Sequence, residues 1–303
     1  MGTVRDLVQV MDDCKASLCK IQLAVARVEL RQLQDSNMDS LRGNEFQAFS
    51  QWGEDGIIQY LIRKIPIENK IFVEFGVGDY TESNTRFLLQ NNNWAGLVID
   101  GVPDYASRIK KDPIYWRFNL KVECAFIDRE NINHIITNAG ISGDIGILSI
   151  DIDGNDYWVW QAIDCIKPRI VICEYNSIYG PLAKVTIPYD SSFVRTKAHY
   201  SNLYYGASLS ALHALARTKG YSLVGSNSAG NNAFFVRDDL ASRLETYEPE
   251  EVYVQSQFRE SRDAGGNLSF LGMSDGMKEI GEMPVYDIDL RGNVRVREIY
   301  TRK

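Results

Sequence analysis

The chain has 303 residues, of which 45% are hydrophobic, so it can form one large α/β domain with a buried core and additions to it. Its formal net charge is −7, and without a run of Lys and Arg it offers no cationic surface for phosphates, which argues against a nucleic-acid partner. The five scattered cysteines have no zinc or redox spacing, no segment is apolar enough to span a membrane, and acids interrupt the first residues, where a secretory signal would be apolar. These features predict a cytoplasmic protein with reduced thiols.

Residues 1–35 are predicted to form an oligomerisation helix. Apolar residues recur there at alternating steps of three and four, which is typical of the seam of a coiled coil. The seam consists of Val4, Leu7, Met11, Cys14, Leu18, Ile21, Val25 and Val28. Such a stripe needs a partner, which is either another copy of the chain or the chain's own domain, and self-association is the favoured interpretation. The polar residues 36–45 are expected to be a linker.

Residues 46–240 alternate between strand and helix patterns, which predicts a doubly wound, mostly parallel sheet with its ligand at the carboxyl ends of the strands. Strands are expected at 70–76, 96–100, about 115–120, 145–151, 169–174, 221–225 and 232–237, and helices at 50–62, 85–90, 157–163 and 207–219. Ser50 is expected to cap the first of these helices. Residues 241–303 are predicted to be a C-terminal extension with strand-like pieces at 268–271, 284–290 and 294–299, placed at a subunit interface or at the edge of the substrate pocket.

The first strand of this domain runs directly into a turn with the pattern Glu74-x-Gly76-x-Gly78. Two residues without side chains permit unusual φ angles and let a ligand approach the backbone closely. Asp100 ends the next apolar strand, and it follows the turn at about 20 residues, the spacing at which an acid meets a ribose diol. The two features together predict a site for a nucleoside cofactor.

Acids accumulate after the fourth and fifth strands of the domain. Asp151, Asp153 and Asp156 follow one strand, and Glu174 and Asn176 follow the next. Parallel neighbours bring these ends together, and their oxygens are ligands that Mg²⁺ prefers. The alternative is a simple turn with a helix cap, which we favour for Asp156. Glu174 and Asn176 would stand about 7 Å apart along a continuing strand, so a shared metal needs the chain to bend between them.

Proton removal in an active site requires either a base or a cation that lowers the pKa of the reacting group. Among the three histidines, His134 and His213 lie on helical patterns, whereas His199 lies in the long, tyrosine-rich segment 177–206. A connection of this length suits a wall over a substrate, although a structural insertion has the same composition. His199 is therefore a candidate catalytic base, in addition to Asp151 as a second candidate catalytic residue.

Several motifs occur in order along residues 46–240. They are Ser50-Gln-Trp-Gly-Glu-Asp, Val73-Glu-Phe-Gly-Val-Gly, Val98-Ile-Asp-Gly, Ser149-Ile-Asp-Ile-Asp-Gly-Asn-Asp and Gly230-Asn-Asn-Ala-Phe-Phe-Val. In this order they resemble the FkbM-like class I S-adenosylmethionine-dependent methyltransferases. The resemblance implies a seven-strand sheet with a reversed final strand, and O-methylation of a hydroxyl on a sugar, a glycan or a natural product.

The resemblance also implies roles for individual residues. The first glycine loop would hold the methionine part of S-adenosylmethionine, Asp100 would hold its ribose hydroxyls, and Asp151 would lie beside the transferred methyl group. The residues implied at the cofactor are Ser50, Gln51, Glu74, Gly76, Gly78, Asp100 and Asp151. Metal-dependent relatives carry one acid after the fourth strand and an acid–Asn pair after the fifth, which gives Asp151, Asp153, Glu174 and Asn176 as candidate ligands of Mg²⁺ or another divalent cation. Tyr175 separates the last two of these ligands, which is a departure from that pattern.

Two other functions fit parts of the pattern. A nicotinamide-dependent oxidoreductase also uses a strand, a glycine loop and a downstream acid, but the full Gly-x-Gly-x-x-Gly is absent because position 81 is Thr81. A non-catalytic scaffold could keep the same fold and use its N-terminal helix for assembly. The sequence does not identify the methyl acceptor.

Overall fold

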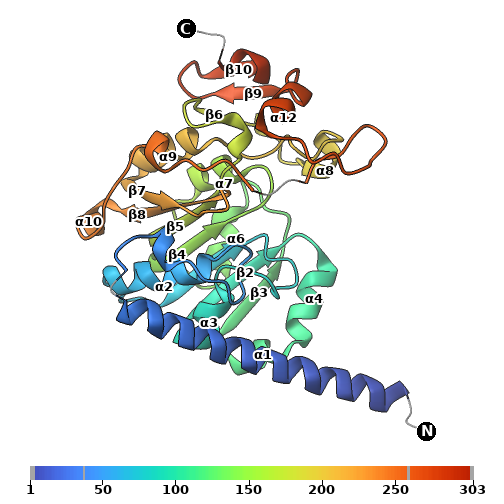
Figure 1. Cartoon of the computed structure of the whole chain (residues 1–303), viewed down its shortest axis with the longest axis vertical. Helices are drawn as coiled ribbons and strands as arrows, with labels where there is room; N and C mark the ends of the chain where they lie inside the picture. The colour runs from blue at the N-terminus through green and yellow to red at the C-terminus, as the bar shows by residue number, and fades with distance from the viewer. Residues whose placement is uncertain (1–3, 37, 258–259, 301–303) are drawn as a thin grey trace.

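The computed structural model describes residues 4–36, 38–257 and 260–300. Its centre is a seven-stranded sheet with the strand order β3-β2-β1-β4-β5-β8-β7 (Figure 1). These strands are β1 Ile71–Phe75, β2 Ala95–Asp100, β3 Leu120–Cys124, β4 Gly143–Ile150, β5 Ile166–Glu174, β7 Tyr221–Ser226 and β8 Asn232–Arg237. The first five are parallel to one another, whereas β8 is antiparallel to both β5 and β7. The predicted doubly wound, mostly parallel sheet with one reversed strand is confirmed.

Helices cover both faces of the sheet, and each face has its own apolar core. One core includes residues of α2 Glu54–Lys64, α3 Arg86–Asn92, α4 Pro103–Lys111, α5 Pro113–Arg117 and α10 Asp238–Ala241; the other includes residues of α6 Ile132–Asn138, α7 Asp156–Ala162 and α9 Leu209–Lys219. Successive residues of β1 supply both, since Phe72 belongs to the first core and Val73 to the second. This two-sided burial explains why the central strands are continuously apolar.

A second, smaller sheet joins two segments that are distant in the sequence. Its order is β10-β9-β6, and it consists of β6 Val185–Thr186, β9 Pro284–Asp287 and β10 Gly292–Arg295. The short helices around this sheet and its connections are η2 Ser177–Tyr179, α8 Arg195–Ala198, α11 Pro249–Val252, α12 Met273–Glu279 and η3 Val296–Glu298. The C-terminal extension therefore packs on the tyrosine-rich segment. The strand expected at 268–271 does not form, and only an isolated bridge joins Leu268 to Arg262.

Two elements of the main domain begin later than expected. The strand placed at about 115–120 starts only at Leu120, because Pro113 and the side chain of Asp112, which accepts a hydrogen bond from the Ile114 N–H, start α5 instead. The helix placed at 50–62 begins at Glu54, after Gly53 in the left-handed region with φ of 106°. Ser50 lies outside this helix, although its hydroxyl accepts a hydrogen bond from the Asp55 N–H at 3.0 Å.

The longest helix, α1 Val4–Asp35, packs on the domain through its second half only. The contacting residues, here called the docking stripe, are Cys19, Leu23, Ala26, Leu30 and Leu33, and they meet Phe46, Ala48, Phe49 and Phe87. The first half projects away from the body (Figure 1). From Leu7 to Val28 the seam predicted from the sequence is exposed, because the docking stripe occupies another face; the side chain of Val4 lies outside the described part of the chain. No helix within the described parts of the chain is both long and apolar enough to cross a membrane. The short 3₁₀ helix η1 Arg42–Asn44 follows α1.

We expect Ala26→Glu to lower the free energy of unfolding by about 2–4 kcal/mol, because it places a charge at a position with only 3% exposure in the docking stripe. Urea denaturation followed by circular dichroism measures this change. Ala16→Glu is the matched control, since residue 16 is exposed on the same helix. Equal losses in both variants would show that α1 is not docked through this stripe.

Candidate active site

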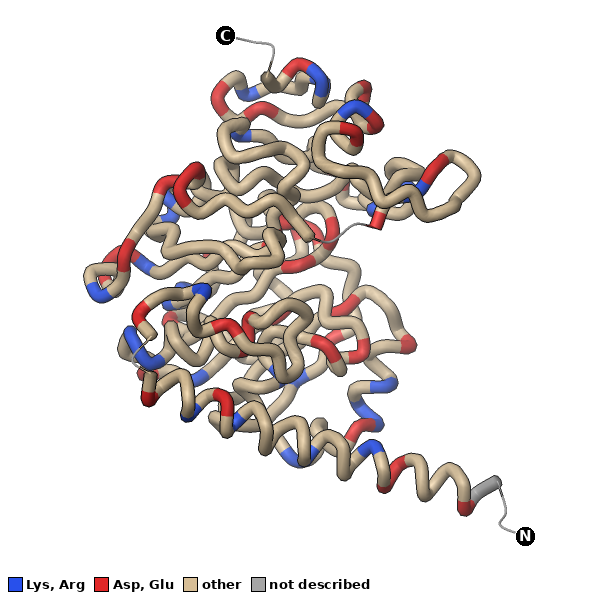
Figure 2. The backbone as a smooth tube through the Cα atoms, in the orientation of Figure 1, with Lys and Arg blue, Asp and Glu red and all other residues tan. Residues whose placement is uncertain are grey.

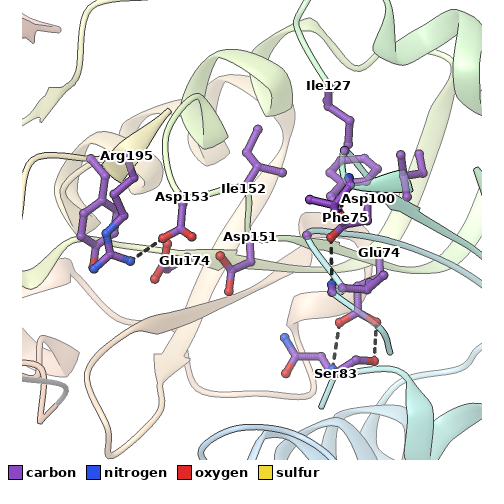
Figure 3. A pocket seen from close by; sticks show the side chains of 18 of the residues that line it. Glu74, Phe75, Ser83, Asp100, Ile127, Asp151, Ile152, Asp153, Glu174 and Arg195 are labelled. Carbon is purple, nitrogen blue, oxygen red and sulfur yellow. Dashed lines mark hydrogen bonds and ion pairs between the residues drawn. The ribbon is translucent and has the colours of Figure 1, made fainter. Parts of the chain in front are cut away.

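A cavity of about 610 Å³ lies at the carboxyl ends of the central strands (Figure 3). Residues after β1, β2 and β4 and at the end of β5 line it, and segment 193–195 contributes one wall. The strand order changes direction between β1 and β4, which is the topological switch point at which open α/β sheets bind ligands. The volume of the cavity is in the usual range of small-molecule sites, roughly 300–1,000 Å³.

The glycine turn after β1 lines this cavity and lies against the end of β4. Gly76 has a φ of 69°, and a Cβ atom built there would lie 1.6 Å from the Asp151 carbonyl oxygen, so only glycine allows the turn to approach the end of β4. Gly78 also has a positive φ, of 54°, but a Cβ atom there would meet no atom within 4 Å. The second glycine therefore faces open space in the cavity.

Asp100 lies at the end of β2 and is 9% exposed. One carboxylate oxygen accepts a hydrogen bond from the Gly78 N–H and the other from the Val102 N–H, both at 2.8 Å. Burial raises the pKa of Asp100, although these two hydrogen bonds oppose the effect. A carboxylate has about four acceptor positions, so each oxygen keeps capacity for a ligand hydroxyl. The aromatic side chains of Tyr105 and Phe126 also line the cavity.

Glu74 lines the cavity, but its carboxylate mainly organises the loop before α3. It accepts hydrogen bonds from the Ser83 hydroxyl at 3.0 Å, from the Asn84 N–H at 2.8 Å, and from both the N–H and the hydroxyl of Thr85. Burial raises the pKa of Glu74, and these donors counteract that rise. Glu74 thus holds the wall of the cavity in place.

The acids of the first motif, residues 50–55, fix the loop at residues 48–52 beside the cavity through hydrogen bonds. One Asp55 oxygen accepts hydrogen bonds from the N–H groups of residues 48, 49 and 50. Glu54 accepts from the Trp52 N–H and from the side-chain amides of Asn227 and Asn232. Gln51 and Trp52 line the cavity, whereas the buried Ser50 does not. Glu54 and Asp55 occupy the first turn of α2, and their side chains also join distant loops, a role that the sequence pattern did not show.

Three carboxylates meet in the part of the cavity at the ends of β4 and β5, as Figure 3 shows. Because Ile150 is paired with Cys173 across β4 and β5, the residues that follow, Asp151 and Glu174, come side by side. Asp153 turns back towards them with a φ of 54°, and single oxygens of the three side chains lie within 4.8 Å of one another. Burial, followed by repulsion from neighbouring carboxylates, raises the pKa of both Asp151 and Glu174 well above the usual range.

Two residues predicted near these acids have other tasks. The Asn176 amide donates to the carbonyl oxygens of Leu203 at 3.0 Å and Tyr205 at 3.1 Å, and its oxygen accepts from the Ile178 N–H. Asn176 is therefore not among the residues that line the cavity. The Asp156 carboxylate accepts from the N–H groups of the preceding turn, at 152 and 154, rather than from the following helix. The turn reading of Asp156 thus agrees with the structure, but the cap reading does not.

The sequence analysis missed Arg195. Its guanidinium group forms an ion pair with Asp153 at 2.5 Å and lies over the ring of Tyr205, with 4.0 Å to the ring centre. Its Nε also donates to the Asn202 carbonyl oxygen at 2.8 Å. A single arginine in a long connection gives no signal of this role, because the acid that it meets, Asp153, lies about 40 residues earlier in the chain.

The structure does not bring His199 to the cavity. Its Nδ1 atom lies 2.8 Å from the Ser201 hydroxyl, its ring stacks on Tyr200, and burial lowers its pKa. Of the tyrosines in segment 177–206, Tyr205 lines the cavity, whereas Tyr179 and Tyr204 belong to the core beside the second sheet. The segment therefore serves as both wall and scaffold.

No protein-family model matches the chain, and no curated protein matches its sequence. The chain is similar to the solved N-terminal domain of EvdMO1 with SAH bound, at 10% identity over 70% of this chain and 94% of that one, with a TM-score of 0.40. It is similar to a S-adenosylmethionine-dependent methyltransferase from Clostridium acetobutylicum, at 10% identity over 74% and 99% of the two chains, with a TM-score of 0.39. An O-methyltransferase from Bacillus cereus in complex with SAH matches at 13% identity over 69% and 89%, with a TM-score of 0.37. Likeness at this level does not establish an activity for this chain.

We expect Gly76→Ala to lower the free energy of unfolding by roughly 3 kcal/mol or more, because the new methyl group would overlap the Asp151 carbonyl at a strained φ. Gly78→Ala is the matched variant and should lose only about 1–2 kcal/mol, the cost of the left-handed conformation alone. Chemical denaturation of both variants measures the difference. Losses of the same size would contradict the close approach of the turn to β4.

Proposed function

We propose that the protein is an S-adenosylmethionine-dependent O-methyltransferase that acts on a hydroxyl of a sugar, a glycan or a natural product. The observation that carries the proposal is one cavity with two chemically different halves, one around Asp100 and the other around Asp151, Asp153 and Glu174 (Figure 3). One half presents Asp100 beside apolar side chains, and the other presents Asp151 among further carboxylates. The first half suits a nucleoside, and the second suits a cation and a polar acceptor.

The cofactor half has the groups that a nucleoside with an amino-acid tail requires. The free acceptor capacity of Asp100 suits the two ribose hydroxyls, and Tyr105 and Phe126 offer apolar surface to the adenine. Gln51 and the glycine turn also line the cavity, and the methionine part would extend along them. When bound, S-adenosylmethionine supplies an electrophilic methyl group on a positively charged sulfur. Asp151, at the edge of the acid cluster, would stabilise that charge.

Several polar atoms of residues that line the cavity are buried and still need a partner. Within the described residues, the acceptors Glu174 Oε2, Asn155 Oδ1 and Asn232 Oδ1 and the donor Trp52 Nε1 are buried without a hydrogen bond. Leaving such atoms unpaired costs about 1–3 kcal/mol each, so a bound molecule is expected to satisfy them. Three acceptors and one donor favour an acceptor molecule that carries several hydroxyl groups.

The carboxylates of the half around Asp151 can also hold the proton that leaves the acceptor hydroxyl. Burial and mutual repulsion increase the proton affinity of Asp151 and Glu174, and the unpaired Glu174 Oε2 can accept a hydrogen bond from the hydroxyl before the transfer. In the balanced reaction, the hydroxyl oxygen forms a bond to the methyl carbon, the sulfur keeps the electron pair of the broken bond, and the proton passes to the protein. Arg195 limits the repulsion by neutralising Asp153.

The same acids fit a divalent cation such as Mg²⁺. Asp151, Asp153 and Glu174 would hold it, since their oxygens converge and Glu174 Oε2 has no other partner within the described residues. Asn176 is not part of this proposed set, because Leu203 and Tyr205 already occupy its amide. A bound cation supplies positive charge that lowers the pKa of the acceptor hydroxyl. Arg195 competes with the cation for Asp153, and we propose that this ion pair opens when the cation binds.

We also propose that the protein works in the cytoplasm and as a homo-oligomer. All five cysteines carry free thiols, as expected for a reducing compartment. The surface that would join the subunits is argued in the next subsection.

We expect Asp100→Asn to weaken S-adenosylmethionine binding roughly tenfold or more, because it removes charge-assisted hydrogen bonds worth about 1.5–3 kcal/mol each. Isothermal titration calorimetry measures the affinity, and Asp104→Asn, at an exposed acid on α4, is the matched control. Unchanged affinity in folded Asp100→Asn would remove Asp100 from the cofactor site. Binding of NAD in place of S-adenosylmethionine would favour an oxidoreductase, and binding of neither would favour a scaffold.

We expect exhaustive chelation to abolish methyl transfer while S-adenosylmethionine binding persists, and Mg²⁺ or Mn²⁺ to restore activity. Calorimetric titration with Mn²⁺ tests the site directly, and Glu174→Gln should reduce the affinity roughly tenfold or more through loss of a charged ligand. Glu68→Gln, at an acid with 85% side-chain exposure, is the control. Full activity after chelation would leave proton removal to the carboxylates alone.

A further inference from the structure

We propose that α1 joins two copies of this chain in a parallel, two-stranded coiled coil through the seam that begins at Leu7 and ends at Val28. This inference does not depend on the proposed methyltransferase function. It rests on three observations, which are the exposure of the seam, the position of the docking stripe and the charges beside the seam.

The apolar side chains of the seam remain exposed in the single chain. Their exposed fractions are 63% for Leu7, 69% for Met11, 66% for Leu18, 59% for Ile21, 58% for Val25 and 52% for Val28, and Cys14 is exposed as well. Val8 and Val10 widen the stripe, with exposures of 51% and 58%. A continuous apolar surface of this length along one helix marks an interaction site.

The body of the same chain cannot cover the seam. The docking stripe and the seam lie on different faces of α1, centred about 120° apart, because a helix turns by about 100° per residue. Ala26, in the docking stripe, is 3% exposed against the domain, whereas its neighbour Val25, in the seam, is 58% exposed. Arg27 adds a hydrogen bond from its Nε to Asn91 Oδ1 at 2.9 Å. Rotation of the seam towards the body would break these contacts, so the covering surface must come from another molecule.

The spacing of the seam selects a helix with the same repeat. Its residues recur with a period of seven, and knobs-into-holes packing requires a partner helix whose apolar residues follow that period. Every other copy of the chain carries such a helix. The first half of α1 projects away from the body of the chain (Figure 1), so the corresponding helix of a second copy can reach its seam.

The charges beside the seam favour the parallel orientation. In a parallel, in-register pair the flanking Lys15 faces Val10 of the other helix, and Glu29 faces Ala24, so no like charges meet. An antiparallel pair that overlaps along the whole seam would place Lys15 against its own copy at the centre. Parallel pairing therefore buries the full seam without this repulsion.

The composition of α1 disfavours a membrane surface as the occupant. Residues 4–35 contain five basic and five acidic residues and no aromatic residue, and Figure 2 shows the two charges interspersed along the helix. Helices that lie on membranes are usually rich in Lys and Arg on the polar face and carry aromatic residues on the other. A protein helix fits this seam better than lipid.

Multi-angle light scattering of the full chain tests the proposal. One chain has a mass of 34.4 kDa, and we expect about twice that mass for the wild type. Leu18→Glu, at the centre of the seam, should reduce the mass to that of one chain, because it places two like charges in the buried interface. Ala16→Glu, which introduces the same side chain two residues away on the opposite face, should leave the mass unchanged. Circular dichroism of each variant confirms that the domain is folded.

A mixing experiment tests the orientation. Residue 18 faces its own copy only in the parallel, in-register pair, so an equal mixture of Leu18→Glu and Leu18→Lys chains should recover the doubled mass through an ion pair. A wild type with the mass of one chain would overturn the proposal. A doubled mass in Leu18→Glu would assign the contact to another surface, and failure of the mixture would overturn the parallel orientation. Binding of the wild type to anionic phosphatidylserine vesicles without a doubled mass would assign the seam to lipid.

Discussion

The close contact between the turn after β1 and the end of β4 determines the shape of the candidate site. Gly76 has no side chain, so its backbone can lie against the Asp151 carbonyl at the point where the strand order changes direction. The acid at the end of β2 and the acids after β4 thereby face a single cavity. A larger residue at this position would separate the turn from β4 and divide the two halves of the site.

Charge is the second constraint, and it is concentrated on one side of the cavity. Asp151 and Glu174 are removed from water and repel each other, an arrangement that is unfavourable unless a proton, an arginine or a bound cation compensates. Arg195 provides part of that compensation from a segment that also forms the second sheet with the C-terminal extension. The smaller sheet therefore contributes to the site indirectly, because it holds the connection from which Arg195 and Tyr205 reach the cavity.

The N-terminal helix shows how one element can serve two surfaces. Its docking stripe contacts Phe49, which directly precedes the loop that carries Gln51 and Trp52 to the cavity. Its seam is exposed on another face of the helix. Through these contacts the proposed dimer would hold α1, and α1 in turn supports the loop at the cofactor half. The docking stripe has its own spacing of three and four residues, which the seam obscures in the sequence because both stripes are apolar.

The sequence by itself determined the central sheet, the glycine turn and the acids at the strand ends, because each depends on a local pattern. Apolar runs buried on both faces predict the strands β1, β4 and β5, and the residue after such a strand lies at the ligand-binding edge of a parallel sheet. The sequence also indicated the apolar seam of α1. Local patterns did not show which partner each polar side chain would take. The start of α5 depended on a cap at Asp112 that competes with the apolar run after it.

Only the tertiary structure decided the partners of the polar groups. It assigned Glu74 and Asp55 to loops, Asn176 to a distant carbonyl pair and His199 to a place outside the cavity, and it brought Arg195 to Asp153 across about 40 residues of chain. It also buried the docking stripe of α1 against the domain and left the seam exposed. The physical reason is the separation along the chain between the groups that interact. Hydrophobic periodicity is local and can be read along the chain, whereas hydrogen bonds and ion pairs between distant segments depend on how the loops are folded over the sheet.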